Sequence, residues 1–322
     1  MKRDPIRRVT TIATALAALA AVTASAQDYP KRPIRVVTSD AGSGSDFSAR
    51  VISKGLSGPL GQQLIVDNRS SVLAPEIVAN AQPDGYTLLF YGSGLWLLPQ
   101  IQADLRYDWA RDYAPIAWAT TSPTVLAVHP SQPVKSVKEL IALARAKPGA
   151  LNYASGAPGT INHLAAEMFK YMAKANIVRI SYKGQGAALT DLVSGQVQLM
   201  FVPAVAVSPH LRSGKLTALV VTSAKPSPLL PGLPTVAEAG GLPGYELVSV
   251  NGVFAPAKTP PAIIARVNRE IARLLAAPEV KELFANAGAE AVGGTPEIFA
   301  ATIKVQAASV GAVIKAAGIR VE

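Results

Sequence analysis

A short segment rich in glycine and serine holds the residue types best suited to binding an anion. Residues 36–50 read VVTSDAGSGSDFSAR: β-forming residues, a Gly/Ser loop, and then the start of a helical apolar period at Phe47, Val51 and Leu56. A strand-to-helix turn of this kind points unpaired backbone N–H groups and the positive end of a helix at one place. Such a place suits a phosphate or a carboxylate.

The spacing within this loop argues against a nucleotide. A dinucleotide fingerprint has a third glycine where this chain has Phe47, and no Gly-Lys-Ser/Thr follows for a phosphate-binding P-loop. Asp46 would repel a highly charged phosphate, but it could cap the helix and accept a hydrogen bond from a ligand hydroxyl or ammonium. We therefore expect a carboxylate at this loop. The alternative is that its glycines serve only a tight turn.

Other candidate chemistry is sparse. His163 could act as a base beside Ser155, but a helix-face histidine hydrogen-bonded to a local partner such as Glu167 is the favoured interpretation. No two histidines stand four residues apart and the chain has no cysteine, so we expect no metal site and no cofactor. A Gly-x-Ser-x-Gly nucleophile elbow is also absent from the sequence.

Strands that alternate with helices must position these loops. The pattern predicts an α/β fold with mainly parallel, helix-covered sheets, whose ligand sites lie beyond the carboxyl ends of the strands. In the first sheet those ends are followed by Ser39 to Ser45, Asn68 to Pro75 and Gly92 to Pro99. The predicted strands are 34–37, 63–68, 87–91, 125–128, 151–154, 178–182, 197–202, 216–222 and 247–255.

A second Gly/Ser loop, residues 155–159, follows the strand 151–154 and mirrors the first. The terminal helices 260–275, 278–287 and 296–317 have no strands of their own, so we expect them to pack on the first sheet. The second domain is then inserted into the first: residues 27–124 plus 250–322 form domain 1, and residues 125–249 form domain 2. Two lobes with two crossings and an anion-receptive loop each predict a hinged clamp around a small molecule.

The first 26 residues have the composition of an export signal. A basic segment precedes an Ala/Leu-rich stretch at 11–22 and the small-residue cleavage site Ala24-Ser25-Ala26. We expect no later stretch to be long and apolar enough to span a membrane, and therefore a soluble periplasmic protein. The formal net charge is +10, but Lys and Arg are scattered without a basic run, which argues against nucleic-acid binding.

Several motifs in this order and spacing resemble the extracytoplasmic solute receptors of the tripartite tricarboxylate transporter family, the Bug proteins. The resemblance covers nearly all of the chain after the export signal. Its motifs are YP at 29–30 with RPIR at 32–35, the glycine-rich loop ending in Ser45-Asp46, DNR at 67–69, PDGYTLL at 83–89, LNYAS at 151–155, YKG at 182–184 with LTDL at 189–192, PTVAEAG at 234–240 and LPGYE at 242–246.

The resemblance implies the two-lobed, Venus-flytrap fold of periplasmic binding proteins. It also implies that the protein is a monomer and is not an enzyme. It implies a small organic carboxylate gripped in the interdomain cleft by both loops, for uptake through a membrane permease or for sensing. Carried over position by position, the ligand-binding residues are Ala41, Gly42, Ser43, Gly44, Ser45 and Asp46 in the first loop, and Ser155, Gly156, Gly159, Thr160 and Asn162 in the second.

Two residues bear on the ligand. Val202 stands where the family has an acidic residue, and Trp96 falls on a predicted binding edge, so both are expected to face a less polar acid than citrate, such as an aromatic or branched monocarboxylate. Two alternatives remain open. One is an accessory protein with a degenerate pocket, and the other is a hydrolase or isomerase that uses Asp46, Ser155 and His163.

Overall fold

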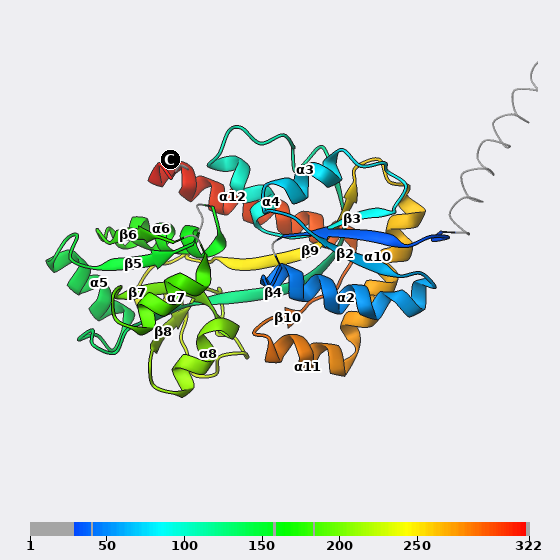
Figure 1. Ribbon diagram of the computed structural model, residues 1–322. Coiled ribbons are helices and arrows are strands. Elements are labelled where there is room, and N and C mark those ends of the chain that lie inside the picture. Colours follow the sequence, from blue (N-terminus) through cyan, green and yellow to red (C-terminus); the bar gives the residue numbers. More distant parts are fainter. Residues whose placement is uncertain (1–28, 40, 157–158, 183, 320–322) are drawn as a thin grey trace, which may run out of the picture.

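The computed structural model describes residues 29–39, 41–156, 159–182 and 184–319, so the predicted export signal lies outside the described residues. Two α/β lobes lie side by side and are joined by two long strands (Figure 1). The predicted two-lobed α/β fold is confirmed.

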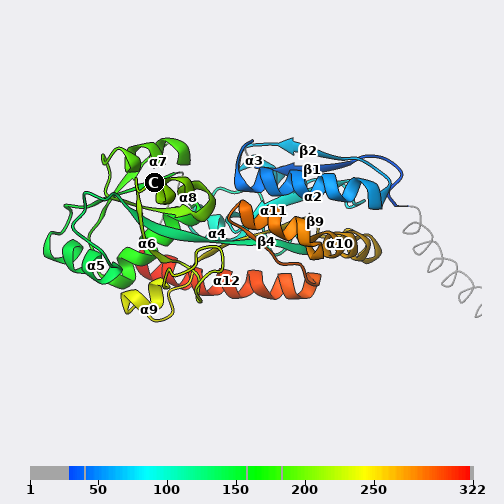
Figure 2. The ribbon, with the colours of Figure 1, turned by 90° about the horizontal axis from the view of Figure 1, so that it is seen from below.

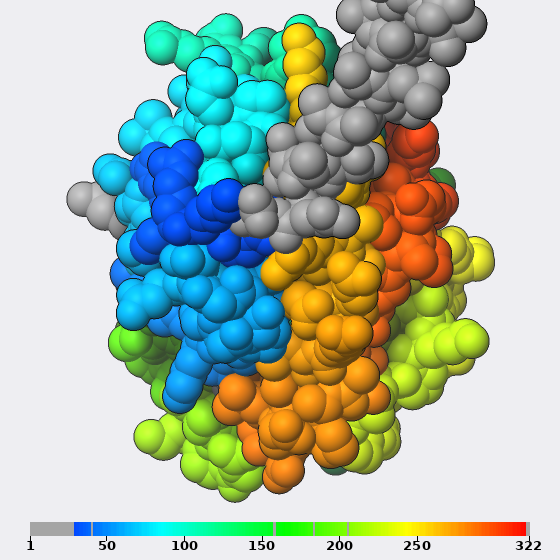
Figure 3. All heavy atoms as spheres, turned by 90° about the vertical axis from the view of Figure 1, so that its right-hand side faces the viewer, coloured from blue at the N-terminus to red at the C-terminus, as the bar shows by residue number. Residues whose placement is uncertain are grey.

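The first lobe contains three parallel strands. β1 (Ile34–Thr38) pairs with β2 (Leu64–Asn68) and with β3 (Thr87–Gly92). The connecting helices are α2 (Gly44–Leu60) and α3 (Leu73–Ala79), and α10 (Pro261–Ala276) and α11 (Pro278–Asn286) add to the cover. Figure 3 looks onto this end of the molecule, where α2 in blue lies beside α10 in gold, and α11 in orange follows α10. Their apolar faces and the sheet form one buried core.

The second lobe repeats this plan. β5 (Asn152–Ser155) pairs in parallel with β6 (Val178–Ser181) and β7 (Leu199–Pro203), while β8 (Thr217–Val221) runs antiparallel to β4. The helices are α5 (Val137–Ala146), α6 (Ile161–Ala173), α7 (Gln185–Val193), α8 (Ala204–Arg212) and the single-turn α9 (Val236–Gly240).

The joining strands are β4 (Tyr113–Val128) and β9 (Val248–Pro256), which pair with each other in antiparallel fashion. They link both lobes into a single sheet of order β2-β1-β3-β9-β4-β7-β5-β6, with β8 and the two-residue β10 (Glu290–Ala291) also on β4. The expectation of mainly parallel sheets therefore holds only for the outer strands, because β3 to β9, β9 to β4 and β4 to β7 are all antiparallel.

The last helix, α12 (Pro296–Ala317), extends along both lobes and contacts β4, α6 and the short helix α4 (Gly94–Leu97), which a 3₁₀ turn, Leu98–Gln100, follows (Figure 2). By length and composition α12 could cross a membrane, so the expectation that no such stretch follows the export signal was wrong. Its buried residues recur every three or four positions, as in a helix that covers a sheet: Phe299, Ile303, Ala307, Val310 and Ile314.

Candidate functional site

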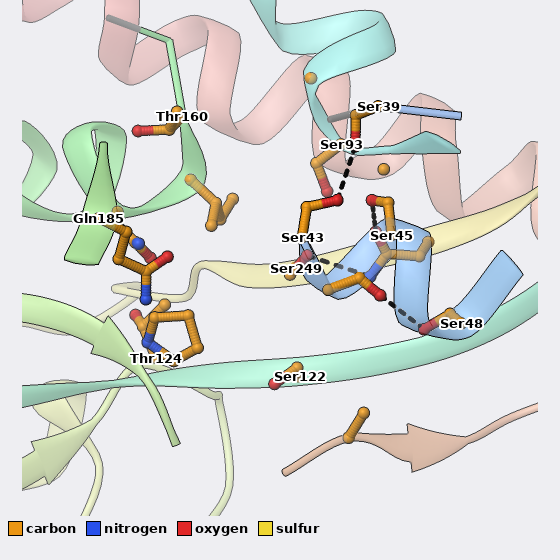
Figure 4. A pocket seen from close by; sticks show the side chains of 18 of the residues that line it. Ser39, Ser43, Ser45, Ser48, Ser93, Ser122, Thr124, Thr160, Gln185 and Ser249 are labelled. Carbon is orange, nitrogen blue, oxygen red and sulfur yellow. Dashed lines mark hydrogen bonds between the residues drawn. The ribbon is translucent and has the colours of Figure 1, made fainter. Parts of the chain in front are cut away.

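A cavity of about 460 Å³ lies between the lobes, at the carboxyl ends of the outer strands. Figure 4 shows Ser39, Ser43, Ser45 and Ser93 on the first-lobe side and Thr160 and Gln185 on the second-lobe side. The volume is in the ordinary range for a small-molecule site. Both loops selected from the sequence border this cavity.

The first loop ends in a capped helix start. Ser43 is the N-cap of α2, and its Oγ accepts a hydrogen bond from the Asp46 N–H at 3.1 Å. The preceding Gly42 has φ +79° and donates its N–H to Asp46 Oδ2 at 2.9 Å. The N–H groups of Gly44 and Ser45 have no acceptor among the described residues, and both residues line the cavity.

Asp46 positions the loop and does not line the cavity. Its carboxylate also accepts from Asn68 Nδ2 at 2.8 Å and pairs with Arg50 Nε at 2.9 Å. Burial acts to raise the pKa of this carboxyl, but the hydrogen bonds from Gly42, Arg50 and Asn68 together lower the pKa below its usual value. Asp46 is thus an ionised anchor with its oxygens already occupied.

The second loop has the same construction with different chemistry. Thr160 is the N-cap of α6, and its Oγ1 accepts from the His163 N–H at 3.4 Å. Gly159, with φ +77°, donates its N–H to His163 Nδ1 at 3.1 Å, as Gly42 does to Asp46. The N–H groups of Ile161 and Asn162 have no acceptor among the residues that the structure describes, and both residues line the cavity.

His163 is a buried structural residue. Burial, assisted by nearby Arg179, lowers the pKa of the imidazole to about 4, so the ring is neutral near pH 7 and Nδ1 can accept. The suggested partner was wrong: Nδ1 accepts from Gly159, whereas Glu167 accepts from the Tyr153 hydroxyl and pairs with Lys170.

Arg179 on β6 supports the second loop from behind, and sequence reasoning missed it. Its Nε donates to Ser155 Oγ at 2.8 Å and its Nη2 to the Gly156 carbonyl at 3.1 Å. The guanidinium has no carboxylate within ion-pair distance among the described residues. Its positive charge therefore adds to the positive end of α6.

Seven of the predicted site residues border the cavity and six do not. Those that border it are Ser43, Gly44, Ser45, Gly156, Gly159, Thr160 and Asn162. Ala41 and Gly42 are exposed at the outer side of the first loop, and Asp46 and Ser155 are buried as supports.

Trp96 and Val202 both lie inside the protein core. Trp96 is fully buried, and its indole N–H donates to Gln306 Oε1 on α12 at 3.1 Å. Val202 is fully buried in the core of the second lobe, and its neighbour Pro203 borders the cavity in its place. Side chains alternate along a strand, so a shift of one residue exchanges the core face for the ligand face.

Polar residues of the two joining strands also border the cavity, and sequence reasoning missed them. They are Thr120, Ser122 and Thr124 on β4, and Ser249 and Asn251 on β9. Their alternate spacing is the signal that could have found them, because residues two apart share one face of a strand.

The enzyme constellation is not assembled among the described residues. Ser155 Oγ bonds to the Gly156 carbonyl and to Arg179, and no hydrogen bond joins it to His163 or Asp46. The arrangement instead offers what an anion needs: four backbone N–H groups, without an acceptor among the described residues, at the N-termini of two helices from opposite lobes.

The chain resembles known proteins over most of its length. Residues 48–319 match the model of the tripartite tricarboxylate transporter family receptor. The chain is 37% identical to protein BugT of Bordetella pertussis over 283 residues, which are 85% of each protein.

Two solved structures share the fold. Rpa4515 of R. palustris with adipate is 36% identical with a TM-score of 0.83, over 91% of this chain and 99% of that one. MatC of Rhodopseudomonas palustris with bound malate is 29% identical with a TM-score of 0.79, over 89% of this chain and 100% of that one. The fold and the cleft between lobes thus define a two-lobed periplasmic binding protein. Within that class, the chain belongs to the tripartite tricarboxylate transporter receptor family.

Proposed function

We propose that this protein is an extracytoplasmic solute-binding protein that captures a small organic carboxylate between its lobes. The observation that supports this is the convergence of two helix N-termini on one cavity. Four N–H groups have no acceptor among the described residues: those of Gly44 and Ser45 come from the first lobe, and those of Ile161 and Asn162 from the second. A carboxylate has two oxygens with several lone pairs and can accept from both lobes at once.

The relatives support the ligand class. The structures of Rpa4515 and MatC hold adipate and malate, both small carboxylates. In this chain Arg179 adds positive charge behind the second loop, and the Asp46 carboxylate is occupied by its own partners. The electrostatics of the described site therefore favour an anion.

Capture would proceed by closure of the two lobes about β4 and β9. We propose domain 1 as residues 27–124 plus 250–322 and domain 2 as residues 125–249, with the hinge where these strands cross between them. A ligand that contacts both lobes stabilises the closed arrangement by its difference in affinity for the closed and open forms.

The cellular role follows from the family and the first 26 residues. We propose export to the periplasm, action as a monomer, and delivery of the ligand to a membrane permease of the tripartite type or use of the protein as a sensor.

A thermal-shift screen tests the binding function. The chain from Gln27 to Glu322 would be heated with mono-, di- and tricarboxylates and, as matched controls, with their methyl esters. Ligand at about 100 times its Kd adds roughly 2.7 kcal/mol to the free energy of unfolding, which raises Tm by a few degrees. We expect shifts with acids and none with esters. A flat screen with folded protein would contradict the proposal and favour an accessory role.

A further inference from the structure

The cavity has a second region whose chemistry differs from that of the loops. Figure 4 shows Ser122 and Thr124 on the side away from Ser39 and Ser93. Ser122 Oγ donates to the Gly288 carbonyl at 2.6 Å, so this side of β4 is in contact with the segment that follows α11. The neighbours of Gly288, Ala287 and Ala289, both line the cavity.

Apolar groups continue around this region, which we call the apolar end. Phe47 on α2 is 37% exposed, and its ring meets Phe284 of α11 edge to face at 6.0 Å. On β4, Pro123 lines the cavity, and the next residue, Thr124, pairs with Pro203 of β7. The apolar end is therefore made of Phe47, Pro123, Pro203, Ala287 and Ala289.

Several hydroxyl groups that line the cavity already form hydrogen bonds within the protein. Ser48 Oγ donates to the Gly44 carbonyl at 2.9 Å, and Ser122 Oγ donates to Gly288. Ser93 Oγ accepts from the Val250 N–H at 3.0 Å, and Thr124 Oγ1 shares a hydrogen bond with Thr222 at 2.9 Å. The protons of Ser48 and Ser122 are therefore already used within the protein.

Among the described residues that line the cavity, no cation is present to pair with a second carboxylate at this end. None of the described residues that line the cavity has a charged side chain. Arg50 is paired with Asp46, and Arg179 stands behind the second loop. Transfer of an ionised group from water to an apolar surface without a partner costs free energy. Transfer of an alkyl or aryl group to the same surface is favourable.

We propose that the ligand is a monocarboxylate with an apolar tail. Its carboxylate binds the loops and its tail contacts the apolar end, with Phe47 and Ala289 as residues that determine specificity. The inference rests on the proposed carboxylate-binding function. It adds that the part of the ligand beyond the carboxylate is apolar.

Matched acids test this directly. Isothermal titration calorimetry would compare butyrate with succinate, hexanoate with adipate, and benzoate with terephthalate, so that only the distal carboxylate differs within each pair. We expect the monocarboxylate of the tightest pair to bind at least about tenfold more strongly, a difference of about 1.4 kcal/mol.

A dicarboxylate that binds as well as or better than its partner would overturn the inference while leaving the proposed function intact. The second carboxylate would then be held by donors elsewhere, such as the N-terminus of α7 at Gly184 and Gln185, both of which line the cavity. Failure of every acid in the screen would instead contradict the proposed function itself.

A change of specificity tests the location of the tail. Ala289→Arg places a cation at the apolar end, and Ala285→Arg places the same cation at an exposed position on α11. We expect Ala289→Arg to weaken hexanoate at least tenfold and to strengthen adipate, and Ala285→Arg to change neither. Circular dichroism would verify that both variants fold. Unchanged hexanoate affinity in folded Ala289→Arg would show that the tail does not contact this end.

Discussion

The two loops share one construction and differ in charge. In each, a glycine with positive φ precedes a hydroxyl N-cap, and the side chain three residues after the cap accepts the glycine N–H: Gly42 to Asp46 in the first lobe, and Gly159 to His163 in the second. The first acceptor is an ionised carboxylate with a lowered pKa, and the second is a neutral imidazole whose pKa is about 4.

The difference shows that the same backbone geometry can be held by opposite electrostatic means. The first loop keeps the negative charge of Asp46, which pairs with Arg50 and accepts a hydrogen bond from Asn68. The second loop has a neutral imidazole in place of the carboxylate, and the guanidinium of Arg179 donates hydrogen bonds to this loop. We therefore expect the second lobe to supply more of the attraction for an anion, and the first lobe more of the fixed geometry.

Gly44→Val gives the largest expected effect. No atom lies within 4 Å of the position of a Cβ at Gly44, so the new side chain stands in the cavity without clashing with the protein. We expect ligand binding to be lost, with a change in stability of less than about 1 kcal/mol because valine is only a moderately poor helix former. Calorimetric titration and chemical unfolding measure the two quantities, and normal titration by this variant would exclude the first loop from the site.

Gly159→Ala compared with Gly42→Ala separates packing from backbone strain. Both glycines have positive φ, so both variants carry the strain of roughly 1 kcal/mol or more for a left-handed alanine. At Gly159 a Cβ would also lie 2.6 Å from Leu98 Cδ1, whereas at Gly42 it meets nothing within 4 Å. We expect Gly159→Ala to lose about 1–3 kcal/mol more than Gly42→Ala in urea unfolding. Equal losses would show that this contact contributes nothing.

Arg179→Gln tests the electrostatic half of the comparison. It removes the positive charge and shortens the donor that reaches Ser155 and Gly156. We expect ligand affinity to fall by about tenfold, a difference of about 1.4 kcal/mol, because the second loop loses its supporting donors and the anion loses a nearby positive charge. Arg179→Lys, which keeps the charge, should recover part of the loss. Wild-type affinity in Arg179→Gln would show that this charge does not contribute to ligand binding.

A further expected effect is a dependence of stability on pH. The pKa of His163 is lower in the folded protein, about 4, than its ordinary value of 6.5, so the unfolded chain binds more protons between these values. The contribution of His163 to stability is complete above about pH 6.5 and falls as the pH drops toward 4. The pKa of Asp46 is lowered from 3.8, so the stabilisation from Asp46 is retained across this window.

His163→Asn should reduce this dependence, because the Asn oxygen can accept from Gly159 and does not titrate. Urea unfolding at pH 7 and pH 4.5 would measure it for both proteins. An identical pH dependence in the variant and the wild type would contradict the role assigned to His163.

Local patterns predicted the elements that border the site, and longer-range packing determined the rest. The Gly/Ser loops and their N-caps are local features, so Ser43, Gly44 and Thr160 could be selected from the sequence. β4 is different: Pro115 and Pro123 interrupt its pattern, and only 125–128 was predicted as a strand, although the strand begins at Tyr113. Its ladder with β9 accommodates Pro115 beside a register shift.

Residues whose role depends on a distant partner could not be predicted from the sequence. Trp96 is directed into the core by Gln306 and Phe254, which are far from it along the chain. Arg179 gains its role from Ser155 and Gly156, which only the pairing of β5 with β6 brings near.

The most direct test of the central claim is an NMR titration of the ¹⁵N-labelled protein with the acid that the screen selects. A carboxylate held by both helix N-termini should shift the amide signals of Gly44, Ser45, Ile161 and Asn162 most strongly, with one common Kd. Large shifts confined to one lobe, or remote from all four amides, would contradict a site built from the two loops.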